Sequence, residues 1–147
     1  MVRYFWMGGA SGVLAGTVLG LIMKYVQQVT EKDIYTLLLN VDFIPFLGDQ
    51  EFSETTEFVF HLSVSFLIGA GYCILISSSN TETLPGRIWL AVFITIPAIL
   101  LYFPLSFLSG SPIVKSSDWL SFYFWTICHL LFAFLLAVFV RITSRFS

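Results

Sequence analysis

Two histidines, His61 and His129, have the chemistry that stands out in this sequence, because each lies inside a long uncharged stretch. Imidazole is the only side chain that, unperturbed, changes its charge between about pH 5 and 8. A polar ring within an apolar segment is costly unless it finds a hydrogen-bond partner or a wet cavity, so it is a candidate functional residue. Three interpretations remain open: two independent structural histidines, a pH-responsive pair, or a metal site.

Small and polar residues accompany the histidines at helical spacing. One stripe consists of His61, Ser65, Gly69 and Cys73, a second of Ser121, Trp125, His129, Ala133 and Ala137, and a third segment offers Thr95, Tyr102 and Ser106. We expect these stripes to line a modest polar core. The two rings differ in depth by about 10 Å at the helical rise. We therefore expect water or Tyr102 to bridge them, and no direct contact.

Patterns for other chemistry are missing from the sequence. It contains no glycine-rich phosphate loop and no HExxH, GxSxG or CxxC motif, and Cys73 and Cys128 have no short ligand spacing. No acidic residue lies in an apolar stretch, which argues against the membrane-carboxylate proton coupling of small multidrug exchangers. A net charge of −2 without a basic cluster argues against nucleic acid as a partner. We predict a protein that is not an enzyme, with no catalytic residue, cofactor or bound metal.

Glycines recur every fourth residue near the N-terminus, at Gly8, Gly12, Gly16 and Gly20. Lipid offers no hydrophobic drive between helices, so helices associate through small residues that let their backbones approach. This glycine-zipper pattern predicts tight helix packing. Its partner remains open: another helix of the same bundle, a second copy in a homodimer, or the wall of a pore.

Four uncharged stretches define the elements that must position these residues. The chain has 147 residues, of which 57% are hydrophobic and only 11% charged, against about 25% charged in soluble domains. A bilayer core of ~30 Å needs about 20 helical residues. We predict an all-α polytopic membrane protein, a single domain over residues 1–147, with four antiparallel transmembrane helices near residues 4–23, 58–77, 88–108 and 119–140.

The cations indicate the orientation. Arg3, Arg87, Arg141 and Arg145 lie at the two ends and in the second connection, whereas the first and third connections carry lysines. The positive-inside rule then favours both termini in the cytoplasm. No small-x-small cleavage site follows the first apolar run, so we expect an uncleaved anchor and not a signal peptide.

The first connection, residues 25–57, is acidic but contains an apolar patch over residues 34–47. The patch is too short to span a membrane. We expect it to lie along the outer surface or to pack over the helix ends as a hydrophobic plug. The alternative is an outer face that binds a cation or a partner.

Several short runs resemble the YagU-like family of small inner-membrane proteins. They are residues 61–65 (HLSVS), 71–73 (GYC), 103–105 (FPL), 129–130 (HL) and, more loosely, 12–16 (GVLAG) with Lys24. The resemblance implies a multi-pass protein of the bacterial plasma membrane, in a family of unknown biochemistry linked to survival in acid. It singles out His61, Ser65, Tyr72 and His129. The first connection and the short tail from Arg141 depart from longer members.

The leading functional hypothesis is therefore a membrane protein whose histidines His61 and His129 sense or buffer acid, with Ser65, Tyr72 and Tyr102 as polar neighbours. One alternative is an accessory subunit that packs on a membrane-protein partner through its glycine face. Another is a small channel or carrier formed as a homo-oligomer. The lipid bilayer is the partner common to all three.

Overall fold

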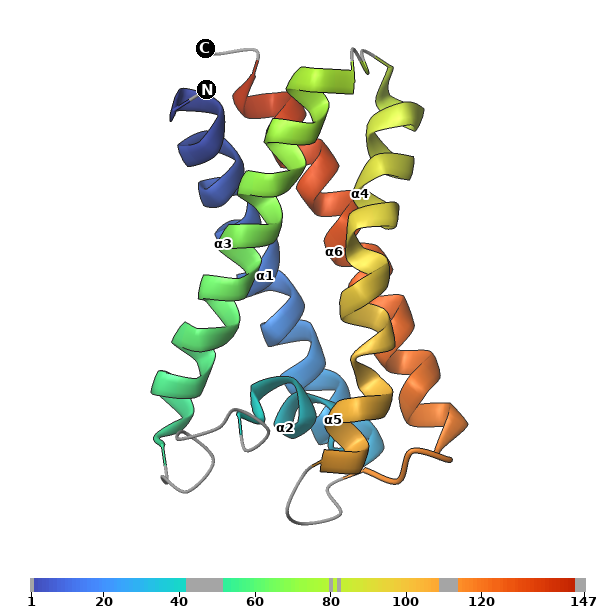
Figure 1. The fold of residues 1–147 in the computed structure, drawn as a ribbon. Coiled ribbons are helices and arrows are strands. Elements are labelled where there is room, and N and C mark those ends of the chain that lie inside the picture. The colour runs from blue at the N-terminus through green and yellow to red at the C-terminus, as the bar shows by residue number, and fades with distance from the viewer. Residues whose placement is uncertain (1, 42–51, 80, 82, 109–113, 145–147) are drawn as a thin grey trace.

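A computed structural model describes residues 2–41, 52–79, 81, 83–108 and 114–144. Its elements are α1 (Val2–Thr30), α2 (Ile34–Leu39), α3 (Glu54–Ser79), α4 (Leu84–Leu100), α5 (Tyr102–Leu108) and α6 (Trp119–Thr143) (Figure 1). α1, α3, α4 with α5, and α6 are each long and apolar enough to cross a membrane. The predicted all-α class with four such helices is confirmed, and the chain has the make-up of a multi-pass membrane protein.

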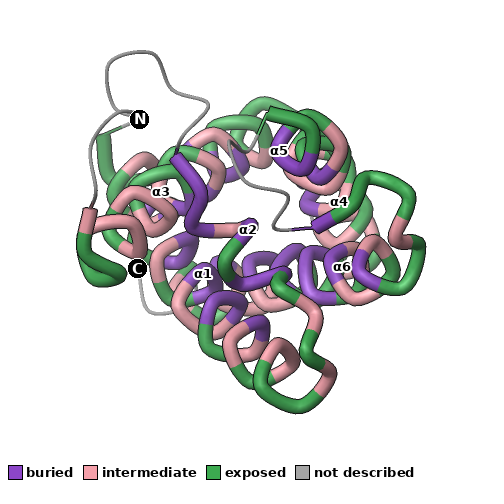
Figure 2. Tube along the Cα trace, turned by 90° about the horizontal axis from the view of Figure 1, so that it is seen from below, coloured by how far each residue is buried: buried purple, intermediate pink, exposed green. Residues whose placement is uncertain are grey.

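The long helices run side by side, with both termini at one end of the bundle and α2 at the other (Figure 1). α1 packs along α3 and α6, and α4 packs along α6. α3 and α4 are packed much less closely, and they diverge toward α2 (Figure 1). Seen from the α2 end, α2 lies across the middle of the bundle (Figure 2).

The glycine face of α1 packs against α3 of the same chain. A methyl group on Gly8 or Gly12 would overlap backbone carbonyl oxygens of α3, those of Gly69 and Ser65 respectively. On Gly16 it would overlap the Ser65 side chain, and on Gly20 the Phe58 ring. α3 therefore covers the glycine face of α1, and these glycines pack against a helix of the same chain.

α1 extends beyond the predicted boundary at residue 23, to Thr30. Lys24 forms an ion pair with Glu54 at 2.6 Å, and the Gln27 side chain accepts hydrogen bonds from the backbone of Tyr35 and Thr36. These partners hold polar residues in helical conformation past the apolar stretch. A charged residue marks where the lipid-facing part of a helix ends, but the helix itself can continue. α3 and α6 are likewise longer than predicted, and they cover residues 54–79 and 119–143.

α2 is the helical part of the apolar patch in the first connection, and it packs over the helix ends. Its Ile34 and Leu37 side chains are fully buried, and Tyr35 donates a hydrogen bond to Glu54 at 2.9 Å. Burial, together with that hydrogen bond, raises the pKa of Tyr35 to about 12. Residues 42–47 of the patch, and the acidic residues Asp42, Asp49 and Glu51 of this connection, lie outside the described residues.

The predicted third span, residues 88–108, consists of two helices that break at Leu101. Pro104 has no backbone N–H, so it cannot bond to the carbonyl of Leu100, and its ring disfavours a continuous helix at that turn. α5 restarts directly after the break. The indole of Trp125 on α6 donates to the carbonyls of Ala98 and Ile99, both at 3.2 Å, and so stabilises the broken turn.

Asp118 is the N-cap of α6, and its carboxylate accepts hydrogen bonds from the backbone N–H groups of Leu120 and Ser121. The same carboxylate forms an ion pair with Lys32 at 2.7 Å, which joins the α1–α2 connection to the start of α6. The hydrogen bond from Lys32 lowers the pKa of Asp118 from 3.8 to about 2. The ion pair therefore stabilises the folded protein in full when the pH is above the ordinary aspartate pKa of 3.8. This stabilisation is lost as the pH falls through the lowered pKa of about 2.

Asp118→Asn should therefore weaken the protein at neutral pH but not in strong acid. Asparagine keeps the helix cap and loses the ion pair, so we expect a loss of about 1 kcal/mol. Unfolding of the two proteins in mixed micelles, followed by circular dichroism, should show this difference at neutral pH and a progressively smaller one as the pH falls through about 2. A difference that is the same at both pH values would contradict the assignment to Lys32.

Candidate functional site

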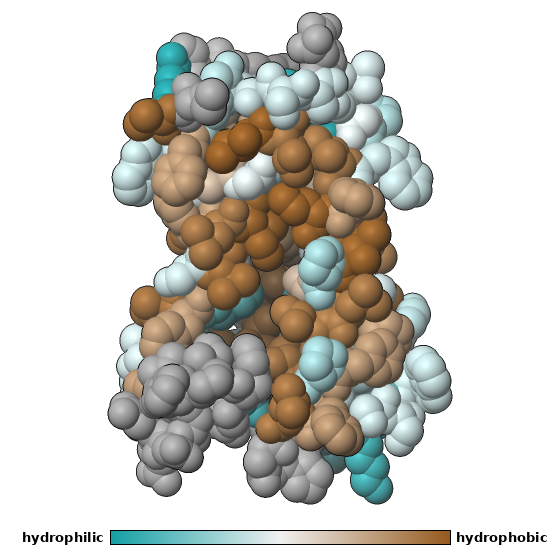
Figure 3. All heavy atoms as spheres, viewed as in Figure 1, coloured by the Kyte–Doolittle hydropathy of each residue, from teal (hydrophilic) through white to brown (hydrophobic). Residues whose placement is uncertain are grey.

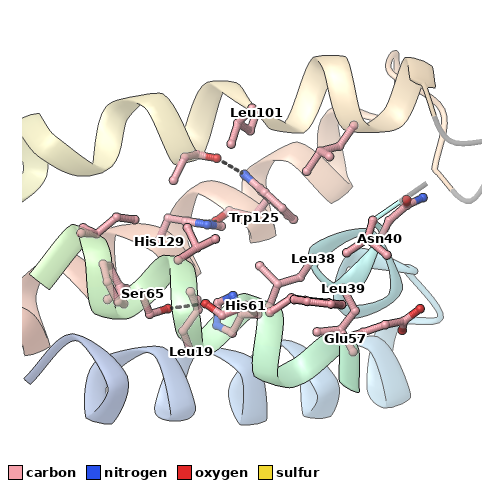
Figure 4. Close-up of a pocket in the computed structure, with 17 residues that line it drawn as sticks. Leu19, Leu38, Leu39, Asn40, Glu57, His61, Ser65, Leu101, Trp125 and His129 are labelled. Atoms are coloured by element: carbon pink, nitrogen blue, oxygen red, sulfur yellow. Dashed lines mark hydrogen bonds between the residues drawn. The ribbon is translucent and has the colours of Figure 1, made fainter. Parts of the chain in front are cut away.

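A cavity of about 140 Å³ lies between α3, α4 and α6, with α2 at one end. Leu38 and Leu39 of α2 and Leu101 at the α4 break form part of its wall (Figure 4). Most of its lining is apolar. Its polar and aromatic lining residues include His61 and Ser65 of α3 on one side and Trp125 and His129 of α6 on the other (Figure 4).

His61 lies about two turns into α3, where its ring reaches α1. Nε2 lies 3.1 Å from the carbonyl oxygen of Gly16. A carbonyl oxygen only accepts, so Nε2 carries the proton and a neutral ring keeps its lone pair on Nδ1. This bond is open to His61 because Gly16 has no side chain to cover its own backbone. The glycine face thus positions a candidate functional residue as well as packing two helices.

His129 lies deeper, with only 4% of its surface exposed. Its Nδ1 lies 2.9 Å from the carbonyl oxygen of Trp125, one turn earlier in α6, so Nδ1 donates and Nε2 keeps the lone pair. The Trp125 and His129 rings lie over each other, with centroids 4.6 Å apart and planes inclined by 35°. The indole therefore restricts the imidazole on one side.

Ser65 is buried, and its hydroxyl donates to the carbonyl oxygen of His61 at 3.0 Å. It lies where α1 and α3 touch, close to Gly16. The bond from Ser65 ends at the backbone of His61, so Ser65 braces the turn of α3 that carries the ring.

The two predicted tyrosines lie away from the cavity. The Tyr72 hydroxyl donates to the carbonyl oxygen of Arg87, where α3 and α4 approach at the end of the bundle that holds the termini. Tyr102 donates to the carbonyl oxygens of Lys115 and Asp118, before α6. The bridge between the histidines that was expected of Tyr102 is therefore not formed, because its hydroxyl already bonds to that connection.

Neither cysteine lines the cavity. Cys73 and Cys128 are both free and buried. Within the described parts of the chain, no group of three or more His, Cys, Asp or Glu side chains is placed to hold a metal ion.

Sequence reasoning placed Trp125 on the stripe of His129 but gave it no role at the site. Its indole proved to join α6 to the α4 break and to form an aromatic wall of the cavity. The sequence feature that could have indicated this role is the spacing of four residues between Trp125 and His129, because residues four apart are neighbours on one face of a helix. Glu57, one turn before His61, also lines the cavity and was not predicted.

Comparison with known proteins returned no matching family model, no matching curated protein and no matching solved structure. The resemblance to the YagU-like family is neither supported nor contradicted by this result, and it stays a prediction.

Proposed function

We propose that this chain is a multi-pass membrane protein, not an enzyme, that responds to acid by protonation of His61 and His129. The observation that carries the proposal is that these two rings, from α3 and α6, line one largely apolar cavity. Each ring is already oriented by a backbone carbonyl. Each keeps one nitrogen able to take up a proton.

The expected response is electrostatic. Protonation of both rings places two positive charges in a cavity of low dielectric, where like charges repel far more strongly than in water. Glu57 is the other titratable group among the described residues that line the cavity. Repulsion would act between α3 and α6. The loosely packed contact between α3 and α4 is where the bundle would yield.

Two further observations support the proposed setting. Arg3 lies in the first turn of α1, Arg87 in the first turn of α4 and Arg141 in the last turn of α6. These helix ends lie at the end of the bundle that holds the termini (Figure 1). With the positive-inside rule, this favours cytoplasmic termini, and the proposal therefore takes the α2 end as the outer side, where acid arrives. The resemblance to the YagU-like family favours the bacterial inner membrane and the link to acid survival.

Replacing both histidines tests the proposal. In His61→Gln/His129→Gln each side chain keeps a hydrogen-bonding amide and loses its titration near neutral pH. We expect cells with this variant to lose most of the acid survival that the wild-type protein confers and to show a larger fall in cytoplasmic pH after challenge. Ser63→Ala, an exposed site on the same helix, is the matched control. A double variant that protects as well as wild type at equal membrane abundance would remove the proposal.

A further inference from the structure

The cavity presents two hydrogen-bond acceptors that no described residue uses. His61 donates from Nε2 to Gly16, and His129 donates from Nδ1 to Trp125. In the neutral rings, Nδ1 of His61 and Nε2 of His129 therefore carry lone pairs. Neither nitrogen is hydrogen-bonded within the described parts of the chain. An acceptor that faces an apolar cavity gains from a donor, so a fitting ligand would bring an O–H or N–H group.

The size and wall of the cavity favour a flat ring. Its volume is about 140 Å³, and an apolar cavity of about 150 Å³ in another protein binds benzene. Trp125 and His129 form an overlapping pair of rings on one side, and Phe60 and Phe132 also line the space. Aromatic rings pack well against such a wall in offset or edge-to-face geometry.

The cavity opens toward the surface that lipid would cover. The face between α3 and α4 is hollowed, and hydrophobic side chains lie above the hollow and beside it, with hydrophilic atoms inside it (Figure 3). Val64 and Leu101 line the cavity and are 53% and 43% exposed, so they lie at its mouth. A molecule that enters there would come from the bilayer and could leave an apolar tail between the diverging helices.

We propose that the cavity binds the hydroxylated aromatic ring of a lipid-soluble molecule, the chemistry of a quinol head group with an apolar tail. A ring hydroxyl donates to Nε2 of His129, and the ring lies against Trp125. A straight-chain alcohol shares the hydroxyl but lacks the flat ring. Binding uses the histidines of the proposed acid response but needs no change in protonation, so the two proposals can fail separately.

The test is a titration of the purified full chain in lipid nanodiscs with decylhydroquinone at about pH 7.5, where unperturbed imidazole is neutral. Decylbenzene has the same ring and tail without the hydroxyls, and decanol has a hydroxyl without the ring. Signals of 15N-labelled histidine report binding at the two rings. We expect decylhydroquinone to bind about tenfold more tightly than either relative, the ratio that one well-made hydrogen bond gives.

Two variants locate the site. Val64→Phe narrows the mouth and should weaken binding about tenfold or more, whereas Leu67→Phe, exposed on the same helix and away from the cavity, should not. His129→Phe keeps a ring and removes the acceptor, so it should abolish the preference for decylhydroquinone over decylbenzene. Equal binding of decylhydroquinone and decylbenzene, an equal effect of the two phenylalanine variants on α3, or tighter binding of decanol would each overturn the proposal. If His129→Phe does not fold, the ligand series and Val64→Phe still decide.

Discussion

Gly12→Ala should destabilise the bundle by about 1–3 kcal/mol, the usual cost of overpacking a well-packed contact. The added methyl group meets the carbonyl oxygen of Ser65 and the backbone of Gly69, so neither obstacle is a flexible side chain that can turn away. α1 and α3 must separate to make room. Unfolding in mixed micelles, followed by circular dichroism, measures the loss.

Gly71→Ala is the matched control, since Gly71 is also a helical glycine and lies on α3. A methyl group there meets only the end of the Ile94 side chain, at an ordinary 3.6 Å. Alanine is intrinsically the better helix former by about 1 kcal/mol at both sites. The difference between the two variants therefore isolates the α1–α3 contact. Equal stability of the two variants would show that the glycine face is not packed on α3 as described.

Trp125→Ala should be the most damaging single change, with an expected loss of about 3–5 kcal/mol. The indole is 1% exposed, and its N–H bonds to the α4 break. Trp125→Phe keeps most of the ring but removes this donor, so we expect a smaller loss of about 1–3 kcal/mol. The same unfolding assay separates the packing of the ring from its hydrogen bond.

Trp119→Phe, at the start of the same helix, is the control for loss of an indole. Trp119 is 70% exposed, so we expect the free energy of unfolding of this variant to stay within about 0.5 kcal/mol of wild type. If Trp125→Phe were equally harmless, the indole bond to the break in α4 would have no part in holding that segment to α6.

The membrane-spanning elements could be predicted because lipid imposes a simple rule on sequence. A helix that crosses a bilayer needs about 20 uncharged residues, and the gaps in charge supplied four such stretches. The ends of the helices could not be read in the same way. Lys24 and Gln27 lie within α1 because they have partners on other helices: Lys24 forms an ion pair with α3, and Gln27 accepts a hydrogen bond from α2.

The meeting of His61 and His129 in one cavity could be predicted only in part. Helical spacing placed each ring on a polar stripe, and residue counting gave a difference in depth. Neither describes how far α3 and α4 diverge, which decides how long the cavity is. At the end where they diverge, α2 lies across the middle of the bundle and contacts α3 and α5 (Figure 2). The two histidines are far apart in sequence, so no local pattern records that they line the same cavity.

Tyr102 also shows what sequence pattern alone could not predict. Its position in an apolar segment favoured a role between the histidines, but Pro104 breaks the helix beside it. Its hydroxyl then bonds to the carbonyl oxygens of Lys115 and Asp118. A proline in the sequence predicts a break but not the direction in which the chain continues.

Histidine NMR during a pH titration tests the central claim most directly, because the chain contains only two histidines. The protein is labelled on histidine with 15N and 13C, placed in lipid and acidified stepwise, and each signal is assigned with the single Gln variants. If the rings share one cavity, both signals should report proton uptake, and the midpoint of His61 should move when His129 is replaced. The claim would be contradicted if the titration midpoint of His61 did not change when His129 is replaced, or if neither ring took up a proton.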